Sequence, residues 1–207
     1  MLPLEFEPDS KNAYSNAGIN TAGRIIEVVS GMRFAKFLDE RLFEPLGMKD
    51  TTFWPAGERL PRLAKAYKPA KGGFEECGIN QLKYPLDDPQ RQPMPAGGLF
   101  STATDLSLFY RMIANGGVLA GKQILSPQAL REITSSQPGN PHYGLGMSTD
   151  GNYIGHGGAY GTNSCFEKQH GLIMIFLVQN AVGWPNGVNP VSVFRKAALD
   201  AFARRSQ

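Results

Sequence analysis

The chain has 207 residues, 42% of them apolar and 19% charged, and its formal net charge at pH 7 is +3. These values are typical of a folded domain, and the charge is too small and too evenly spread to indicate a nucleic-acid-binding protein. The longest apolar run, Leu172–Val178, is far shorter than the roughly 18 residues of a membrane span. Two cysteines cannot build a disulfide framework, and the 24 glycines and 15 prolines have no period, which excludes collagen and low-complexity sequence.

Two consecutive helices are predicted near the start of the chain. Ala17–Ser30 has apolar residues at helical spacing, with Asn16 as the expected N-cap and Gly31 as the left-handed residue at its end. Phe34–Phe43 follows with a second apolar face, and Pro45 and Gly47 are expected to stop it. Residues 48–100 are rich in Pro and Gly, which predicts long loops with short strands.

The second half of the chain predicts helices and then a sheet. Ser101–Asn115 has a helical apolar stripe, and Ser126-Pro127 opens a shorter helix. Four strands and a terminal helix follow, at Tyr143–Ser148, Tyr153–Gly155, Thr162–Glu167, Leu172–Gln179 and Val191–Arg204. Because Leu172–Val178 is apolar at every position, we expect it to be a central strand covered on both faces. The whole therefore predicts one α+β domain, with 1–142 mainly helices and loops and 143–207 sheet strands plus the terminal helix.

Few residues suggest chemistry when they are taken one at a time. The three histidines, His142, His156 and His170, have no spacing that suits a helix-face metal pair and no carboxylate cluster beside them, so we predict no metal and no cofactor. Taken singly, Tyr14-Ser15-Asn16 is better explained as a helix cap than as part of a site. Taken singly, His156–Gly161 is likewise better explained as a turn that needs glycine.

Five segments, taken together in their order along the chain, indicate a function more specifically than the single residues do. They are Pro8–Gly18 with Tyr-x-Asn, Phe43–Met48 with Pro-Leu-Gly-Met, Pro95–Leu106 with Pro-Ala-Gly-Gly-Leu, Tyr143–Met147, and Gly155–Gly158. This ordered set resembles the serine β-lactamase and penicillin-binding-protein superfamily, most closely its class C β-lactamase and family VIII carboxylesterase branch. The resemblance runs from about residue 2 to the C-terminus and implies a β-lactamase/transpeptidase-like fold, with an antiparallel sheet covered by helices.

The resemblance also implies roles for particular residues. In the family, the tyrosine of Tyr-x-Asn works beside a lysine as general base and then as acid, a role that falls here to Tyr14. A free tyrosine, with a pKa near 10, needs such a cation to act as a base at neutral pH. By the same resemblance, Asn16 would bind substrate or hold the lysine, and the backbone N–H of Ala159 would help to bind the oxyanion.

The last motif implies a substrate-binding edge. Gly157 and Gly158 would let substrate lie against the strand, and Tyr160 would add an aromatic wall. His156 stands where true β-lactamases have a lysine that helps to hold a substrate carboxylate. Because a histidine with an unperturbed pKa near 6.5 is mostly neutral at pH 7, this change disfavours a β-lactam and favours a small ester or amide substrate.

The family's nucleophile is missing from the sequence. It lies in Ser-x-x-Lys, but here no Ser or Thr has Lys three residues later, and Ser30 and Ser192 have Arg at that spacing. Arg cannot serve as a base. We therefore expect the chain to be the C-terminal part of such a domain and to be inactive alone. The apolar face with Ile25, Ile26 and Val29, together with one sheet edge, would then be uncovered and favour self-association.

Three hypotheses remain. The first is a serine hydrolase, most simply a carboxylesterase, with β-lactamase or D-amino-acid peptidase activity as alternatives within the same chemistry. The second is a non-catalytic ligand-binding module, and the third is an interaction protein that recruits a partner through its helix face. An in-frame Ser-x-x-Lys in the upstream DNA would favour the first hypothesis over the second. The sequence leaves the compartment open.

Overall fold

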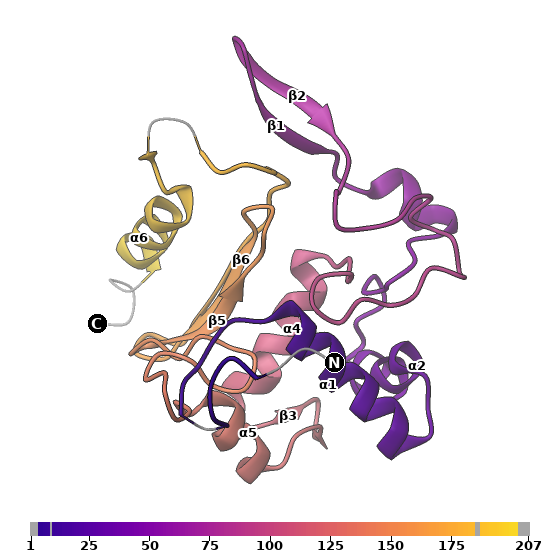
Figure 1. Cartoon of the computed structure of the whole chain (residues 1–207). Coiled ribbons are helices and arrows are strands. Elements are labelled where there is room, and N and C mark those ends of the chain that lie inside the picture. Colours follow the sequence, from indigo (N-terminus) through magenta and orange to yellow (C-terminus); the bar gives the residue numbers. More distant parts are fainter. Residues whose placement is uncertain (1–3, 9, 185–186, 203–207) are drawn as a thin grey trace.

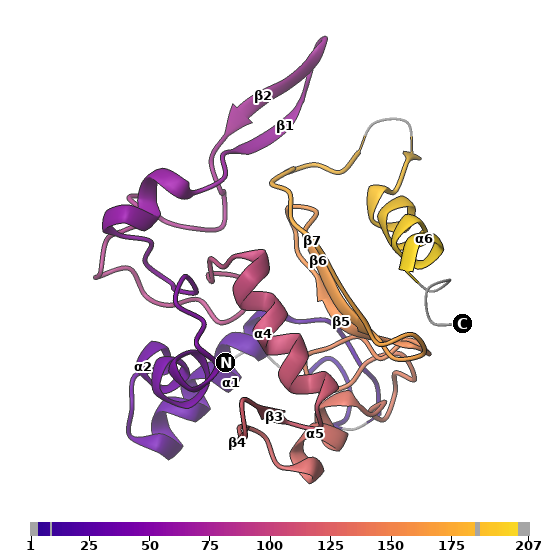
Figure 2. The same ribbon diagram turned by 180° about the vertical axis from the view of Figure 1, so that it is seen from behind.

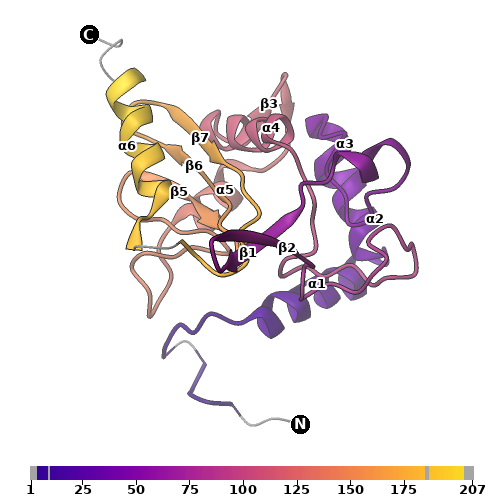
Figure 3. The same cartoon turned by 90° about the horizontal axis from the view of Figure 1, so that it is seen from above.

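The computed structural model describes residues 4–8, 10–184 and 187–202. Its centre is an antiparallel sheet with strand order β5-β6-β7, formed by Tyr153–Gly157, Asn163–Glu167 and Leu172–Phe176. Helix α4 (Ala103–Ala114) lies on one face of this sheet and α6 (Pro190–Phe202) on the other (Figures 1 and 2). The N-terminal helices lie beyond α4, as the view from above shows (Figure 3). The predicted α+β fold with an antiparallel sheet is confirmed. In the described part of the chain, no helix has both the length and the apolar composition to cross a membrane.

The position of β7 corrects one prediction. Within the described residues β7 pairs with β6 alone, so β6 is the central strand and β7 lies at the edge. The apolar composition of Leu172–Phe176 has another cause, because α4 packs on one side of β7 and α6 on the other. On the α6 side the rings of Phe176 and Phe194 are 5.5 Å apart. A strand covered on both faces by helices reads as apolar whether or not it has two neighbouring strands.

Helix α1 spans Asn16–Ser30 and begins one residue earlier than predicted. The N-cap is Ser15, whose Oγ accepts a hydrogen bond from the Gly18 N–H at 3.0 Å, so the expectation that Asn16 caps the helix is wrong. Gly31 ends the helix at φ 69°, as predicted. Ile25 and Val29 are exposed by 57% and 81%, as expected for an uncovered apolar face. Ile26 is partly buried, because α1 packs it against Phe34 and Phe53, so for this residue the expectation is wrong.

The second helix is longer than its proline suggested. It runs through α2 (Phe34–Leu38), a π-helical turn at Asp39–Phe43 and α3 (Glu44–Leu46). It ends at Gly47 with φ 75°, so the prediction that Gly47 stops it is confirmed. Pro45 therefore does not stop the helix. It lies in the first turn of α3, directly after the π turn, where a missing N–H and a fixed φ are tolerated.

The Pro- and Gly-rich stretch contains a projecting hairpin. After a 3₁₀ turn at Gly57–Arg62, strands β1 (Ala66–Ala70) and β2 (Gly73–Cys77) pair and extend away from the rest of the molecule (Figure 1). The base of the hairpin is tied to the chain beyond β7. Tyr67 donates its N–H to Gln179 O at 2.8 Å and accepts at its own carbonyl from Ala181 N–H at 2.7 Å.

A buried carboxylate joins two of the family-like segments. Asp105, in the first turn of α4, is 4% exposed, and its Oδ2 accepts from the Asp50 N–H and from Thr51 Oγ1, both at 2.8 Å. Thr51 Oγ1 also lies 2.8 Å from Ser101 Oγ, and Thr102 caps α4. The segment after Pro-Leu-Gly-Met is thereby fixed to the start of α4.

The remaining elements complete the core. They are β3 (Val118–Leu119), β4 (Lys122–Gln123) and α5 (Pro127–Thr134), which Ser126 caps as predicted. The predicted strand at Tyr143–Ser148 is only a turn closed by a bridge between its two end residues. The main core surrounds α4, toward the sheet on one side and toward α3 on the other, and contains Phe43, Leu46, Met48, Tyr110, Met112, Ile113, Leu119, Met147 and Ile154.

The close packing of β5 against β6 gives a stability prediction at Gly155. A Cβ at this position would lie 2.2 Å from Ser164 O and 2.5 Å from the Cβ of Cys165, so the strands would have to separate. We expect Gly155→Ala to lower the free energy of unfolding by about 2 kcal/mol or more, measured by urea denaturation. Gly157→Ala on the same strand is the control. Its Cβ would lie no closer than 3.4 Å to a neighbouring atom, Asn163 Nδ2, so it should change stability by less than about 1 kcal/mol. Equal losses in the two variants would contradict the packing argument.

Candidate active site

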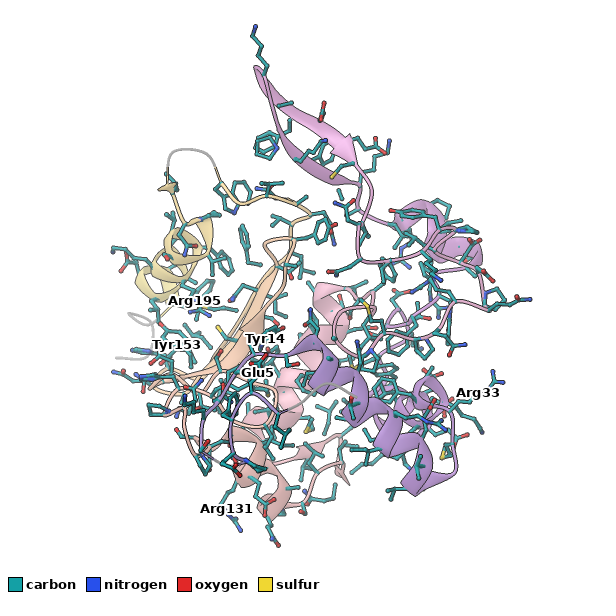
Figure 4. All side chains as sticks on the ribbon, in the orientation of Figure 1. Glu5, Tyr14, Arg33, Arg131, Tyr153 and Arg195 are labelled. Atoms are coloured by element: carbon teal, nitrogen blue, oxygen red, sulfur yellow. The ribbon has the colours of Figure 1, made fainter. Side chains whose placement is uncertain are left out.

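Two segments that are far apart in the sequence meet at the start of α1. Tyr14 directly precedes the Ser15 cap, and His156 lies in β5. Their rings stack, with centroids 6.1 Å apart and an interplanar angle of 28°. Figure 4 shows Tyr14 where the chain passes the sheet before it enters α1. The structure therefore brings together the tyrosine of Tyr-x-Asn and the histidine of His-Gly-Gly, while the Tyr14 side chain stays 68% exposed.

A second tyrosine, which the sequence reasoning did not single out, belongs to the same cluster. Tyr143 Oη lies 2.8 Å from His156 Nε2, and the two rings meet edge to face at 5.8 Å. Burial raises the pKa of Tyr143, with a smaller contribution from the nearby Tyr14. Tyr143 is the first residue of the family-like segment Tyr143–Met147, from which the sequence predicts only a strand.

The other nitrogen of His156 is also engaged. Its Nδ1 lies 2.6 Å from the carbonyl oxygen of Gly157. The imidazole is therefore held at both nitrogens, and its face is turned to Tyr14.

The glycines after His156 form an exposed turn. Gly157 has room for a Cβ, with its nearest neighbour at 3.4 Å, whereas a Cβ on Gly158 would lie 2.2 Å from Thr162 Oγ1. The Gly158 N–H donates to Thr162 O at 2.8 Å, which closes the turn. Ala159 is exposed in this turn, and in the described part of the chain its N–H donates no hydrogen bond. An exposed N–H of this kind can bind a developing oxyanion.

Tyr160 and Asn16 lie at the margins of the cluster. Tyr160 Oη accepts from the Asn80 N–H at 2.9 Å, and its ring packs with Ala66 and Ile79. The Tyr160 hydroxyl thus links the loop after β2 to the end of the sheet. The role of the Tyr160 ring as an aromatic wall of the substrate site stays a prediction. Asn16 is exposed as the first residue of α1.

A pocket of about 650 Å³ lies along α1. Its wall includes Asn20 and Gly23, which follow Asn16 at helical spacing and so continue the same side of the helix. Asn20 Oδ1 accepts from the Ala96 N–H at 3.0 Å, and a Cβ on Gly23 would lie 2.4 Å from Pro95 Cγ. These contacts hold the Pro-Ala-Gly-Gly segment against α1. Among the residues that the structure describes, no three His, Cys, Asp or Glu side chains gather closely enough to hold a metal ion.

Comparison with known proteins shows the family of the chain. The model of the family described as Beta-lactamase matches residues 1–195, nearly the whole chain. The chain belongs to the beta-lactamase family. Among curated members, it is 27% identical over 169 residues to a protein of Escherichia coli O157:H7 named "Putative D-alanyl-D-alanine carboxypeptidase". That match covers 72% of this chain and 37% of the relative, so the chain spans less than two fifths of that relative's length.

Solved structures of the superfamily share the fold. EstCE1, described as a hydrolase with promiscuous acyltransferase activity, superimposes with a TM-score of 0.73 at 20% identity, covering 92% of this chain and 57% of that one. The octameric penicillin-binding protein homologue from Pyrococcus abyssi gives 0.70 at 21% identity, covering 96% of this chain and 44% of the other. At these sequence identities the structural similarity shows a shared fold and no more.

Proposed function

We propose that this chain carries the acid–base and oxyanion-binding part of a serine hydrolase that works through an acyl-enzyme. The observation that carries the proposal is the stacking of Tyr14 on His156, because it unites the Tyr-x-Asn and His-Gly-Gly segments in one place. Serine nucleophiles need an adjacent base, and a tyrosine can be that base only beside a cation that lowers its pKa. We propose that this cation is the lysine of a Ser-x-x-Lys segment outside these 207 residues, which themselves contain no such motif.

The proposed reaction has two steps. Tyr14, as phenolate beside the lysine, takes the serine proton while the serine oxygen attacks the carbonyl carbon of the substrate. The Ala159 N–H and the nucleophile's own N–H stabilise the oxyanion, and Tyr14 returns the proton to the leaving group as the acyl-enzyme forms. Water, deprotonated in the same way, then releases the acid product.

The proposed substrate is a small ester. His156 replaces the permanent cation that would hold a substrate carboxylate, and the other features of the site do not replace that charge: Gly157, Gly158 and Ala159 are small and uncharged. A second candidate is D-amino-acid peptidase chemistry, which the name of the Escherichia coli relative favours. Parallel assays with a nitrophenyl ester and a D-alanyl-D-alanine peptide would separate the two.

The test of the proposed function is labelling by a fluorescent phosphonate, which reacts with activated serines. We expect no label on the chain alone. We expect strong label when an N-terminal segment with Ser-x-x-Lys, taken from a related enzyme, is added, and none when the serine of that segment is changed to alanine. The oligomeric state should be checked in both samples by light scattering, because exposed Ile25 and Val29 favour self-association.

Two results would contradict the proposal. Label on the chain alone, or its steady hydrolysis of a nitrophenyl ester with loss in Tyr14→Phe, would show that a nucleophile is present within these residues. Absence of label in a folded and complete assembly would instead support the non-catalytic binding module.

A further inference from the structure

The hydrogen bonds of His156 define which nitrogen carries its proton. The Gly157 carbonyl can only accept, so Nδ1 must be protonated for the 2.6 Å contact to be a hydrogen bond. In the neutral ring Nε2 is then an acceptor, and the Tyr143 hydroxyl at 2.8 Å is its donor. Both nitrogens are thereby occupied.

The backbone holds Tyr143 in the position that this contact needs. Its carbonyl accepts from the Gln137 N–H at 2.9 Å, and a bridge pairs it with Ser148. Ser148 in turn exchanges two hydrogen bonds with Gly155, the residue before His156, at 2.8 and 3.1 Å. Gly144 passes so close to α5 that a Cβ would lie 2.1 Å from Ile133 O. The turn therefore fixes the hydroxyl relative to β5.

We propose that Tyr143 is a positioning residue that acts through His156. This proposal rests on the function proposed above. The Tyr143 hydroxyl holds the imidazole in the tautomer with its proton on Nδ1, because it donates a hydrogen bond to Nε2. His156 then presents its ring face to Tyr14 instead of a nitrogen to the substrate. Tyr14 alone exchanges protons with the reacting groups, and the imidazole limits the rotation of the Tyr14 ring by stacking on it.

The hydrogen bond between Tyr143 and His156 also bears on which substrates the site accepts. Since Nε2 is paired with the phenol, it has no hydrogen to offer to a substrate carboxylate. The site therefore selects acyl groups without a carboxylate at that end, which is the ester class proposed above. Removal of the Tyr143 hydroxyl would free Nε2 and loosen the ring.

The test is nitrogen NMR of the histidine side chains in the ¹⁵N-labelled chain at pH 8, where an ordinary histidine is neutral. In the wild type we expect His156 to show a protonated Nδ1 and an unprotonated Nε2 with the shift of a hydrogen-bonded nitrogen. In Tyr143→Phe the Nε2 signal should move toward that of a free, unprotonated nitrogen. The control is Tyr153→Phe on the opposite face of β5, where the guanidinium of Arg195 covers the ring at 4.7 Å. It should leave the His156 signals unchanged.

The outcomes separate this inference from the proposed hydrolase. A wild-type His156 with its proton on Nε2 overturns the inference with no variant needed, and so does a Tyr143→Phe spectrum identical to the wild type. Neither result bears on phosphonate labelling. In the assembled enzyme we expect Tyr143→Phe to lower kcat for a nitrophenyl ester about tenfold, with KM within about twofold. A variant with normal kcat would also overturn the positioning role.

Discussion

Replacing Tyr14 by phenylalanine should lower the kcat/KM of the assembled enzyme for a nitrophenyl ester by about 10² to 10⁴-fold. The ring and its stacking on His156 are retained, so the variant removes only the hydroxyl that moves the proton. The measurement is steady-state hydrolysis by the chain combined with a Ser-x-x-Lys segment. Phosphonate labelling of the same samples should slow in parallel, because that reaction also requires an activated serine.

The control for Tyr14 is Tyr153→Phe, which removes a hydroxyl from β5 on the face toward α6. It should keep kcat/KM within about threefold of the wild type. Far-UV circular dichroism should show that both variants are folded, since Tyr14 is largely exposed and contributes little to the core. If Tyr14→Phe retained full activity, another group would be the base and the proposed mechanism would be wrong.

Asp105→Ala should lower the free energy of unfolding by about 2 kcal/mol. The substitution leaves the Asp50 N–H without its acceptor and the Thr51 hydroxyl with Ser101 Oγ alone, and an unsatisfied buried group costs about 1–3 kcal/mol. The measurement is urea denaturation at pH 7 followed by circular dichroism. The loss should also release the segment after Pro-Leu-Gly-Met from α4, which hydrogen exchange at Asp50 and Thr52 would detect.

Two matched variants test the reason for this loss. Asp105→Asn keeps one carbonyl oxygen as acceptor and should lose less than Asp105→Ala. Asp150→Ala removes a carboxylate that is 75% exposed and should stay within about 0.5 kcal/mol of the wild type. If Asp105→Ala were as stable as Asp150→Ala, the buried acceptor would not be what holds these segments.

The sequence predicted those features that depend on neighbouring residues. The left-handed glycine Gly31 and the cap at Ser126 are set by a few adjacent side chains, and both are confirmed. The edge position of β7 could not be predicted, because its apolar faces are covered by α4 and α6, which lie far from it in the sequence. The prediction that Pro45 stops the helix was wrong for a related reason. A π turn just before it changes which backbone N–H and C=O groups must be paired.

The candidate site likewise has features that the sequence predicts and features that it does not. The assignment of Tyr14 and His156 to one site followed from the order of family-like motifs, which carries information about distant residues that periodicity does not. The stacking of the two rings was not predicted. Tyr143 was missed, because a turn that bridges to β5 is recognisable only once the partner strand is known. The cap at Ser15 was assigned one residue too late, since both Ser15 and Asn16 are good capping residues.

The distance along the chain between Tyr14 and His156 also has a consequence for folding order. Helices α1 and α4 are local and can form on a microsecond timescale, whereas the stacked pair requires the first and last thirds of the chain to meet. Closing so long a loop carries an entropic cost that only the assembled sheet can offset. The rings of Tyr14 and His156 should therefore stack only in the last stage of folding, after the hydrogen bonds between β5 and β6 have formed.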